Sequence, residues 1–289
     1  MNASSARKAS TISTLAMAAL LCVAALSPAA PCQAATSAPP LESEEFMIPS
    51  GDPGIELYVR NKHGQGIKAF ASERVLLFVH GATYPAETTF DLKLAGISMM
   101  EFLAQRGYDV YLVDVRGYGR STRPPEMDQP ADQNAPIART DTAVKDVGAA
   151  VDFILKRRKI PKINLMGWSW GTAIMGWYTA QNNDKVNKLV LYAPRWLNST
   201  PSPANSAGKL AAYRTVTMES AKERWLKGVA EEKKAALIPA GWFEAWAAAT
   251  LGSDPAGSKQ TPPSCGRRTG SCRTARNTGM PASPSTTRP

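Results

Sequence analysis

The chain has 289 residues, a length that allows one large domain or two small ones. Hydrophobic residues make up 44% and charged residues 20%, which excludes a collagen-like, coiled-coil or wholly disordered chain. Most of the net charge of +10 comes from the two ends, because residues 1–37 and 255–289 contain basic residues and no acidic ones. The stretch between them is close to neutral, so we expect no nucleic-acid partner.

Residues 1–35 have the pattern of a secretory signal peptide. Two basic residues near the start precede an apolar run, Leu15–Leu26, and small residues then lead to a cleavage site after Ala34 or Ala35. The apolar run is shorter than the ~20 residues that a membrane-spanning helix needs. We therefore expect a secreted or periplasmic protein with no stable membrane anchor after cleavage.

Residues 36–194 alternate between strand and helix patterns, which predicts a core domain. The expected strands, in chain order, are 45–49, 55–60, 74–79, 108–113, 162–166 and 186–192. The expected helices are 92–106, 140–158 and 172–181. The run 74–79 is continuously apolar, as in strands that are buried on both faces. The alternation predicts an α/β fold with a mostly parallel sheet and helices on both faces.

Residues 167–171 read Gly-Trp-Ser-Trp-Gly and lie between an expected strand and an expected helix. G-x-S-x-G in this context is the pattern of a nucleophile elbow, in which a strained turn holds the serine hydroxyl above the sheet. The flanking glycines are needed because a side chain there would strike the neighbouring strand or helix. The pattern predicts that Ser169 is the nucleophile of an acyl-transfer reaction.

A second motif, His80-Gly81-Ala82, follows the buried strand 74–79. Acyl transfer places negative charge on the carbonyl oxygen of the substrate, and two fixed backbone N–H groups stabilise that charge. The candidates are the N–H groups of Ala82 and Trp170. We interpret His80 and Gly81 as residues that orient this loop, because the catalytic base in this chain order follows the serine.

A third motif, D-x-R-G-x-G-x-S, covers residues 114–121 and follows the strand 108–113. With these three motifs in this order, residues 44–193 resemble the α/β-hydrolase family. The resemblance implies that Asp114 is a structural turn residue and not a nucleophile. Trp170 directly after the serine is similar to the proline iminopeptidase branch, whereas Trp168 stands where that branch often has glycine.

The resemblance implies that residues 195–254 begin a cap above the serine, so we expect a partial helical cap. Residues 209–236 have a helical pattern, and aromatic residues gather across the segment, namely Trp196, Trp225, Trp242, Phe243 and Trp246. These aromatic side chains fit either an apolar pocket for a small acyl group or the cap's own core.

The base and the carboxylate that a serine nucleophile needs have no candidates in their usual place. In the family's chain order both follow the serine, but His63 and His80 precede Ser169 and are the chain's two histidines. The last acidic residue is Asp254, inside the expected cap, and the last two strands of the sheet are missing as well. We therefore expect the chain as written to be inactive, with a hydrophobic sheet edge exposed.

The segment 255–289 contains no Leu, Ile, Val, Phe, Tyr or Trp and predicts a disordered basic tail. Its composition also fits a GC-rich gene read out of frame, because back-translation in another frame can give aromatic and acidic residues. Our hypothesis is that a frameshift near residues 260–263 replaced the rest of a hydrolase.

Taken together, these features predict a serine hydrolase acting on a small-molecule ester, amide or short peptide, with no metal or organic cofactor. Two alternatives stay open. One is a non-catalytic binding protein or pseudo-hydrolase on the same fold, and the other is a proline iminopeptidase-like peptidase. The missing base leaves open whether the chain is an enzyme.

Overall fold

The computed structural model describes residues 39–194, 210–254 and 271–275, all within one compact unit, Ala38–Pro289. The expected signal peptide, residues 1–35, and most of the expected tail lie outside the described residues. Within the described ranges, no helix combines the length and apolar character that crossing a membrane requires.

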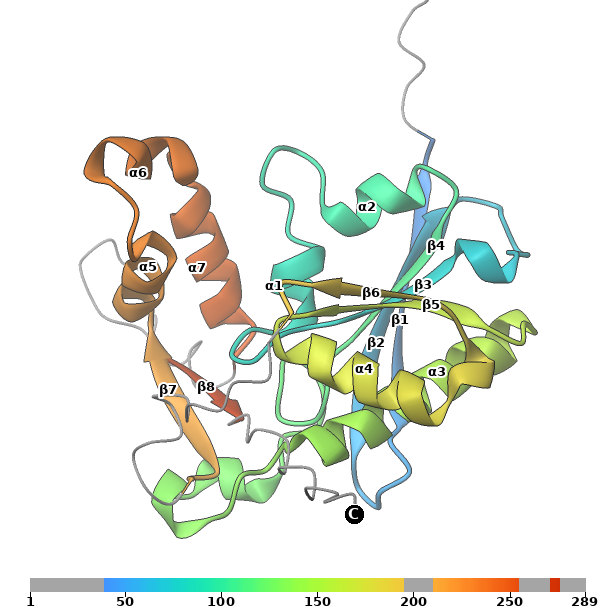
Figure 1. The fold of residues 1–289 in the computed structure, drawn as a ribbon, viewed down its shortest axis with the longest axis horizontal. Coiled ribbons are helices and arrows are strands. Elements are labelled where there is room, and N and C mark those ends of the chain that lie inside the picture. Colours follow the sequence, from blue (N-terminus) through green and yellow to red (C-terminus); the bar gives the residue numbers. More distant parts are fainter. Residues whose placement is uncertain (1–38, 195–209, 255–270, 276–289) are drawn as a thin grey trace, which may run out of the picture. The chain divides into compact units, whose positions relative to one another are not determined.

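Six strands form one sheet in the order β1-β2-β4-β3-β5-β6 (Figure 1). Their bounds are β1 Leu41–Pro49, β2 Glu56–Gly64, β3 Val75–Val79, β4 Asp109–Val113, β5 Ile163–Trp168 and β6 Val186–Tyr192. β1 pairs antiparallel with β2, and β2 pairs antiparallel with β4, whereas the pairs among β3, β4, β5 and β6 are parallel. The predicted α/β fold with a mostly parallel sheet is confirmed.

Helices cover both faces of this sheet (Figure 1). They are α1 (Ala86–Phe90), α2 (Met99–Ala104), α3 (Thr140–Arg158) and α4 (Trp170–Gln181). Val147 and Ile154 of α3 pack with Ile174 of α4 against one face, and Phe90 and Met100 pack against the other. The helical spacing of the α3 valines places them on one side of the helix, which is why α3 agrees with its sequence prediction.

The predicted helix over 92–106 is wrong in its extent, because α2 begins at Met99 and the short helix α1 precedes it. The side chain of Ser98 accepts the N–H of Glu101, and the Glu101 carboxylate accepts the N–H of Ser98. This capping box stops the helix from extending further towards the N-terminus. The loop before it includes Gly96, whose φ of 81° is unsuited to a helix.

The segment after the core contains β7 (Tyr213–Thr217), α5 (Met218–Leu226), α6 (Glu231–Leu237) and α7 (Trp242–Gly252). The prediction of a helical pattern throughout 209–236 is wrong, because a strand opens the segment and Gly228, with φ 77°, separates α5 from α6. Ser271–Ala275, in the segment expected to be disordered, forms β8 and pairs antiparallel with β7. Short 3₁₀ helices occur at Ser72–Arg74, Pro125–Asp128, Ala131–Gln133 and Asn183–Lys185.

Candidate active site

Ser169 lies on the turn between β5 and α4, as the elbow pattern predicts. Its backbone has φ 52° and ψ −114°, a conformation that costs free energy for a residue with a side chain. Its N–H donates to the carbonyl oxygen of Tyr192 at 3.0 Å. Its carbonyl oxygen accepts from the N–H of Thr172 at 3.0 Å and from the Thr172 hydroxyl at 2.6 Å. These hydrogen bonds hold the strained turn in place.

At the two glycines of the elbow, Gly167 and Gly171, backbone atoms approach one another directly. A Cβ atom at Gly167 would lie 2.2 Å from the carbonyl oxygen of Gly171, and one at Gly171 would lie 2.6 Å from that of Val79. Both distances are far below a van der Waals contact, and the opposing atoms belong to the backbone and cannot rotate away. The start of α4 therefore packs directly against the end of β3, and larger residues are excluded at both positions.

The loop after β3 passes against the nucleophile. A Cβ atom at Gly81 would lie 3.1 Å from the Cβ of Ser169 and 3.2 Å from the carbonyl oxygen of Trp168. Ala82, the next residue, packs half-buried against the core. The structure thus brings together Ser169, its neighbour Trp170 and the loop containing Gly81 and Ala82.

His80 is fully buried and uses both ring nitrogens on the backbone. Its Nε2 lies 3.2 Å from the N–H of Val115, which can only donate, so Nε2 accepts and Nδ1–H donates to the carbonyl oxygen of Gly81 at 2.7 Å. Burial lowers the pKa of His80 to about 4, outweighing the Gly81 hydrogen bond. In this arrangement a neutral His80 links the loop to the end of β4, and neither ring nitrogen is left for Ser169.

Thr83, at the end of the same loop, carries a second strained backbone, with φ 99° on a β-branched residue. The Arg214 guanidinium of β7 donates to the Thr83 hydroxyl, and the Tyr118 hydroxyl bonds to the Thr83 backbone. Neither contact was predicted from the sequence. Tyr118 lies within the D-x-R-G-x-G-x-S motif and could have been considered, whereas no local pattern points to Arg214.

The buried Asp114 carboxylate organises the turn of the third motif. Its Oδ1 accepts the N–H of Ala86 at 2.8 Å and its Oδ2 accepts the N–H of Arg120 at 3.3 Å. A Cβ atom at Gly119 would lie 2.1 Å from Oδ2, so that glycine makes room for the carboxylate. Burial raises the pKa of Asp114 to about 6, against the two backbone hydrogen bonds that lower it.

Aromatic residues of α7, in the segment expected to form the cap, cluster next to the elbow. Trp246 and Phe243 of α7 pack in a core with Tyr84, and Trp168, directly before Ser169, packs against that core. Beside it lies an open cavity of about 380 Å³ lined by apolar residues, namely Leu94, Trp225, Leu237, Ile238, Pro239, Trp242 and Trp246. Trp246 therefore contributes both to the cap's own core and to a cavity.

Another cavity, of about 780 Å³, lies between α1, the third motif and α7. Its charged lining residues are Glu87, Asp91, Asp114, Arg120 and Arg123. Ser169 lines neither this cavity nor the apolar one. Because Arg60 binds both Glu87 and Asp91, and backbone N–H groups bind Asp114, these acids already have partners.

The Ser169 hydroxyl has no hydrogen-bond partner among the residues that the structure describes. His80 is occupied as described above, and His63 lies near the end of β2, where it contacts Gly64 and Glu44. The acidic group nearest the end of α7, Asp254, lies 3.8 Å from Arg123. In the described part of the chain, therefore, no histidine nitrogen is free to act as the base for Ser169.

Comparison with known proteins gives a matching family model and several curated relatives. The family model described as the alpha/beta hydrolase fold matches residues 74–259, more than half of the chain. Human lysosomal acid lipase/cholesteryl ester hydrolase is 24% identical over 132 residues, covering 46% of this chain and 33% of that protein. Human lipase member K is 22% identical over 149 residues, covering 52% and 37%. The chain thus spans about a third of the length of these curated relatives.

Two solved structures also match part of the chain. Epoxide hydrolase I from potato (Solanum tuberosum) is 22% identical with a TM-score of 0.40, covering 56% of this chain and 43% of that one. An epoxide hydrolase from Vigna radiata is 18% identical with a TM-score of 0.39, covering 57% and 43%. Both TM-scores lie below 0.5.

Proposed function

The chain belongs to the alpha/beta hydrolase fold family, and we propose that it carries the nucleophile part of a serine hydrolase acting on ester or amide bonds. The observation that carries this proposal is the strained backbone of Ser169 at the β5–α4 turn, with φ 52°. Strain of this kind persists where the surrounding structure enforces it, which is typical of functional sites. A serine used only for packing would have no need of this turn.

The proposed reaction begins with attack of the Ser169 hydroxyl oxygen on the carbonyl carbon of the substrate. The backbone N–H groups of Ala82 and Trp170 stabilise the negative oxygen that forms. The hydroxyl proton passes to a base and then to the leaving alcohol or amine, and an acyl-enzyme remains. In the second half, the base takes a proton from water, the water oxygen attacks the acyl carbonyl carbon, and the bond to the Ser169 oxygen breaks as that oxygen takes up the proton and the acid leaves.

The chain's two histidines precede Ser169 and bind backbone carbonyl groups elsewhere, so we propose that the chain lacks the base for this reaction and is inactive or nearly so. An oxyanion hole and substrate binding alone leave about 10³–10⁴-fold acceleration over water. We propose that the acid and the histidine belong to sequence displaced by a frameshift near residues 260–263. Sequencing the gene past codon 250 tests this, and an uninterrupted frame encoding the present tail with no such continuation would contradict it.

For the substrate we propose an ester with an apolar acyl group. The aromatic core that includes Trp246 packs against Trp168, one residue before the nucleophile, and an apolar cavity lies beside that core. The curated relatives are named as lipases and a cholesteryl ester hydrolase, which favours esters over amides or short peptides. The apolar run near the N-terminus supports export to the periplasm or the outside as part of this proposal.

A Ser169→Cys variant tests the nucleophile role without the missing base, because a thiol ionises near pH 8.5 by itself. We expect the new thiolate to attack p-nitrophenyl butyrate, releasing p-nitrophenolate and leaving a butyryl thioester that mass spectrometry locates. Because an oxyanion donor is worth about 10²-fold or more, acylation should be at least about tenfold faster than at an ordinary exposed thiol.

The matched control is Ser43→Cys, which places a thiol at an exposed position of β1. Peptide mapping separates both sites from the chain's own four cysteines. Equal acylation of the two variants would contradict the proposal. It would favour the alternative that the chain is a non-catalytic binding protein on this fold.

A further inference from the structure

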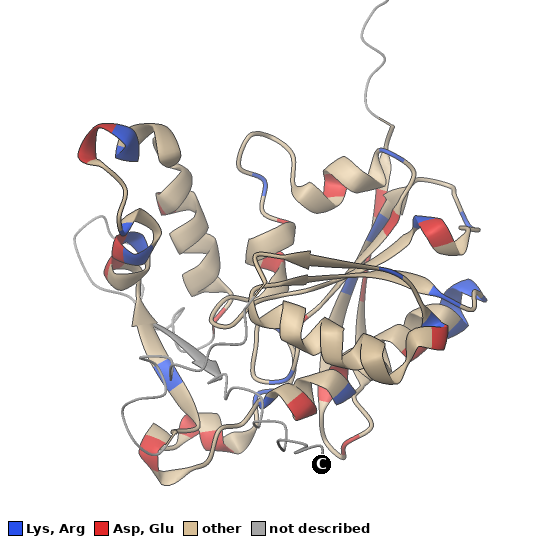
Figure 2. Ribbon diagram, viewed as in Figure 1, with Lys and Arg blue, Asp and Glu red and all other residues tan. Residues whose placement is uncertain are grey.

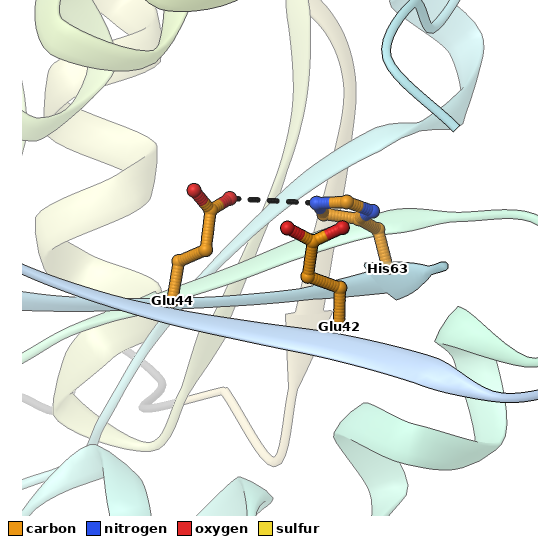
Figure 3. A group of neighbouring side chains, drawn as sticks. All are labelled: Glu42, Glu44 and His63. Atoms are coloured by element: carbon orange, nitrogen blue, oxygen red, sulfur yellow. Dashed lines mark hydrogen bonds and ion pairs between the residues drawn. The ribbon is translucent and has the colours of Figure 1, made fainter. Parts of the chain in front are cut away.

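Three potential metal ligands converge on the first two strands of the sheet. Glu42 and Glu44 are two positions apart on β1, so their side chains emerge from the same face. His63 on β2 lies directly opposite Glu42 in the antiparallel register, where side chains of paired residues lie close together. Figure 3 shows the two carboxylates and the imidazole turned towards one another.

The hydrogen bonding of His63 directs Nε2 towards the carboxylates. Nδ1 lies 2.9 Å from the carbonyl oxygen of Gly64, which can only accept, so Nδ1 carries a proton. In the neutral ring, Nε2 therefore carries a lone pair and no proton. The Nε2 atom lies 3.4 Å from Oε2 of Glu44. A lone pair facing a carboxylate is unfavourable, so either a proton on Nε2, donated to Glu44, or a metal ion bound to both groups must lie between them. A backbone carbonyl that fixes one ring nitrogen is also the usual support for a metal-binding histidine.

The surroundings of the cluster keep its ligands in place and charged. The His63 ring is 3% exposed and packs edge-on against Phe70 at 5.6 Å. Arg157 forms an ion pair with Glu44. Partial burial acts to raise the pKa of Glu44, but Arg157 and His63 outweigh it, and the pKa lies below its usual value. Glu42 is exposed and makes no hydrogen bond or ion pair with the described residues, so its carboxylate is available.

We propose that Glu42, Glu44 and His63 bind one divalent first-row transition ion that joins β1 to β2. Their donor atoms all lie within 4.8 Å of one another, and rotation of the exposed Glu42 side chain can close the set to bonding distance. One imidazole with two carboxylates suits Zn²⁺ or its neighbours, whereas Mg²⁺ and Ca²⁺ bind almost entirely through oxygen.

The site lies at the opposite end of the sheet from the nucleophile. Lys62, next to His63, pairs with Val110 near the start of β4, whereas Ser169 follows the last residue of β5, which is parallel to β3 and β4. An ion at Glu42, Glu44 and His63 therefore has a structural role and takes no part in chemistry at Ser169.

Zn²⁺ titration of the full chain, freed of metal with EDTA and with its thiols alkylated, tests the proposal by calorimetry. We expect one ion per chain and a rise in Tm with Zn²⁺, because binding to the folded state stabilises it. Glu42→Gln and His63→Gln should each weaken binding about tenfold or more, while Glu73→Gln, an exposed acid outside the cluster, should leave it unchanged.

Glu42→Gln alters an exposed side chain with no described partner, so it separates loss of a ligand from loss of the fold, which circular dichroism checks. Co²⁺ absorption supplies a second readout, since removal of a ligand changes its visible spectrum. Zn²⁺ affinity that is the same in Glu42→Gln, His63→Gln and the unaltered chain would overturn the proposal. Absence of binding in the unaltered chain would overturn it as well, leaving an ion pair between His63, Glu44 and Arg157.

Discussion

The elbow around Ser169 and the outer strand β6 are neighbours in the fold but differ in how completely they are packed. At the elbow, Gly167 and Gly171 let backbone touch backbone, and the buried His80 has both nitrogens satisfied. On β6, Val190, Leu191 and Tyr192 expose 47%, 44% and 58% of their surface. β6 pairs with β5 on one side and, within the described residues, with nothing on the other.

The opposite edge of the sheet shows what an edge strand usually looks like. β1 carries Glu42, Ser43 and Glu45 at exposed positions, and such polar and charged residues discourage pairing with another chain. β6 carries few charges, as Figure 2 shows. The two regions therefore differ in packing. The nucleophile turn is fully packed, whereas β6 has the composition of a strand that lies inside a sheet.

The largest expected effect is at the elbow glycines. Gly171→Ala would place a methyl group 2.6 Å from the carbonyl oxygen of Val79, so we expect a loss of about 3 kcal/mol or more in unfolding free energy. The control is Gly176→Ala in the same helix, where nothing lies within 4 Å, and we expect a gain of about 0.5–1 kcal/mol. Urea unfolding followed by circular dichroism measures both. Similar effects of the two substitutions would mean that the elbow is loosely packed.

The second effect concerns His80 and its pH dependence. Burial holds the pKa of the folded state at about 4, below the ordinary value of 6.5, so between these values the unfolded chain binds more protons. Stability from a neutral His80 is thus complete above pH 6.5 and is lost as the pH falls to 4. From pH 6.5 to pH 4, the unfolding free energy of the unaltered chain should fall by about 3 kcal/mol more than that of the His80→Gln variant. If the difference in unfolding free energy between these two proteins stays constant with pH, water reaches the His80 ring and burial does not lower its pKa.

The smallest effect on stability, below about 1 kcal/mol, is expected on β6. Val190→Lys places a charge on the apolar edge, so we expect the protein's self-association to fall, as measured by sedimentation. Met47→Lys on β1 is the matched control, because Met47 is 48% exposed on the other outer strand, and it should change association little. Equal self-association of the two variants would contradict the proposed difference between the β1 and β6 edges of the sheet.

Much of the fold could be predicted from local patterns. The apolar run that forms β3 and the helical spacing of valines in α3 each reflect one periodicity, and both elements lie where the sequence predicts them. The helical pattern predicts a start at residue 92, but the start of α2 could have been predicted as well, because Ser98 and Glu101 have the spacing of a capping box. β7 was missed because its alternating Tyr, Thr and Val residues were interpreted together with the helical segment that follows.

The candidate site likewise has some features that local sequence patterns predict and others that they do not. The turn at Ser169 depends on five consecutive residues and could be predicted, and so could the loop beginning at His80. The hydrogen bond from Arg214 to Thr83 joins positions 131 residues apart, so no local pattern reveals it. It depends on where β7 packs, which is decided by tertiary contacts.

The hydrogen bond from the Ser169 N–H to the carbonyl oxygen of Tyr192 joins the two regions compared above. Strand ends at an open edge fray, and such local unfolding needs less free energy than global unfolding. When the end of β6 frays, the Ser169 amide loses its acceptor and the strained turn loses one of its restraints. One restraint on the nucleophile therefore depends on the opening equilibrium of an outer strand, and a further strand paired with β6 would strengthen that restraint without touching Ser169.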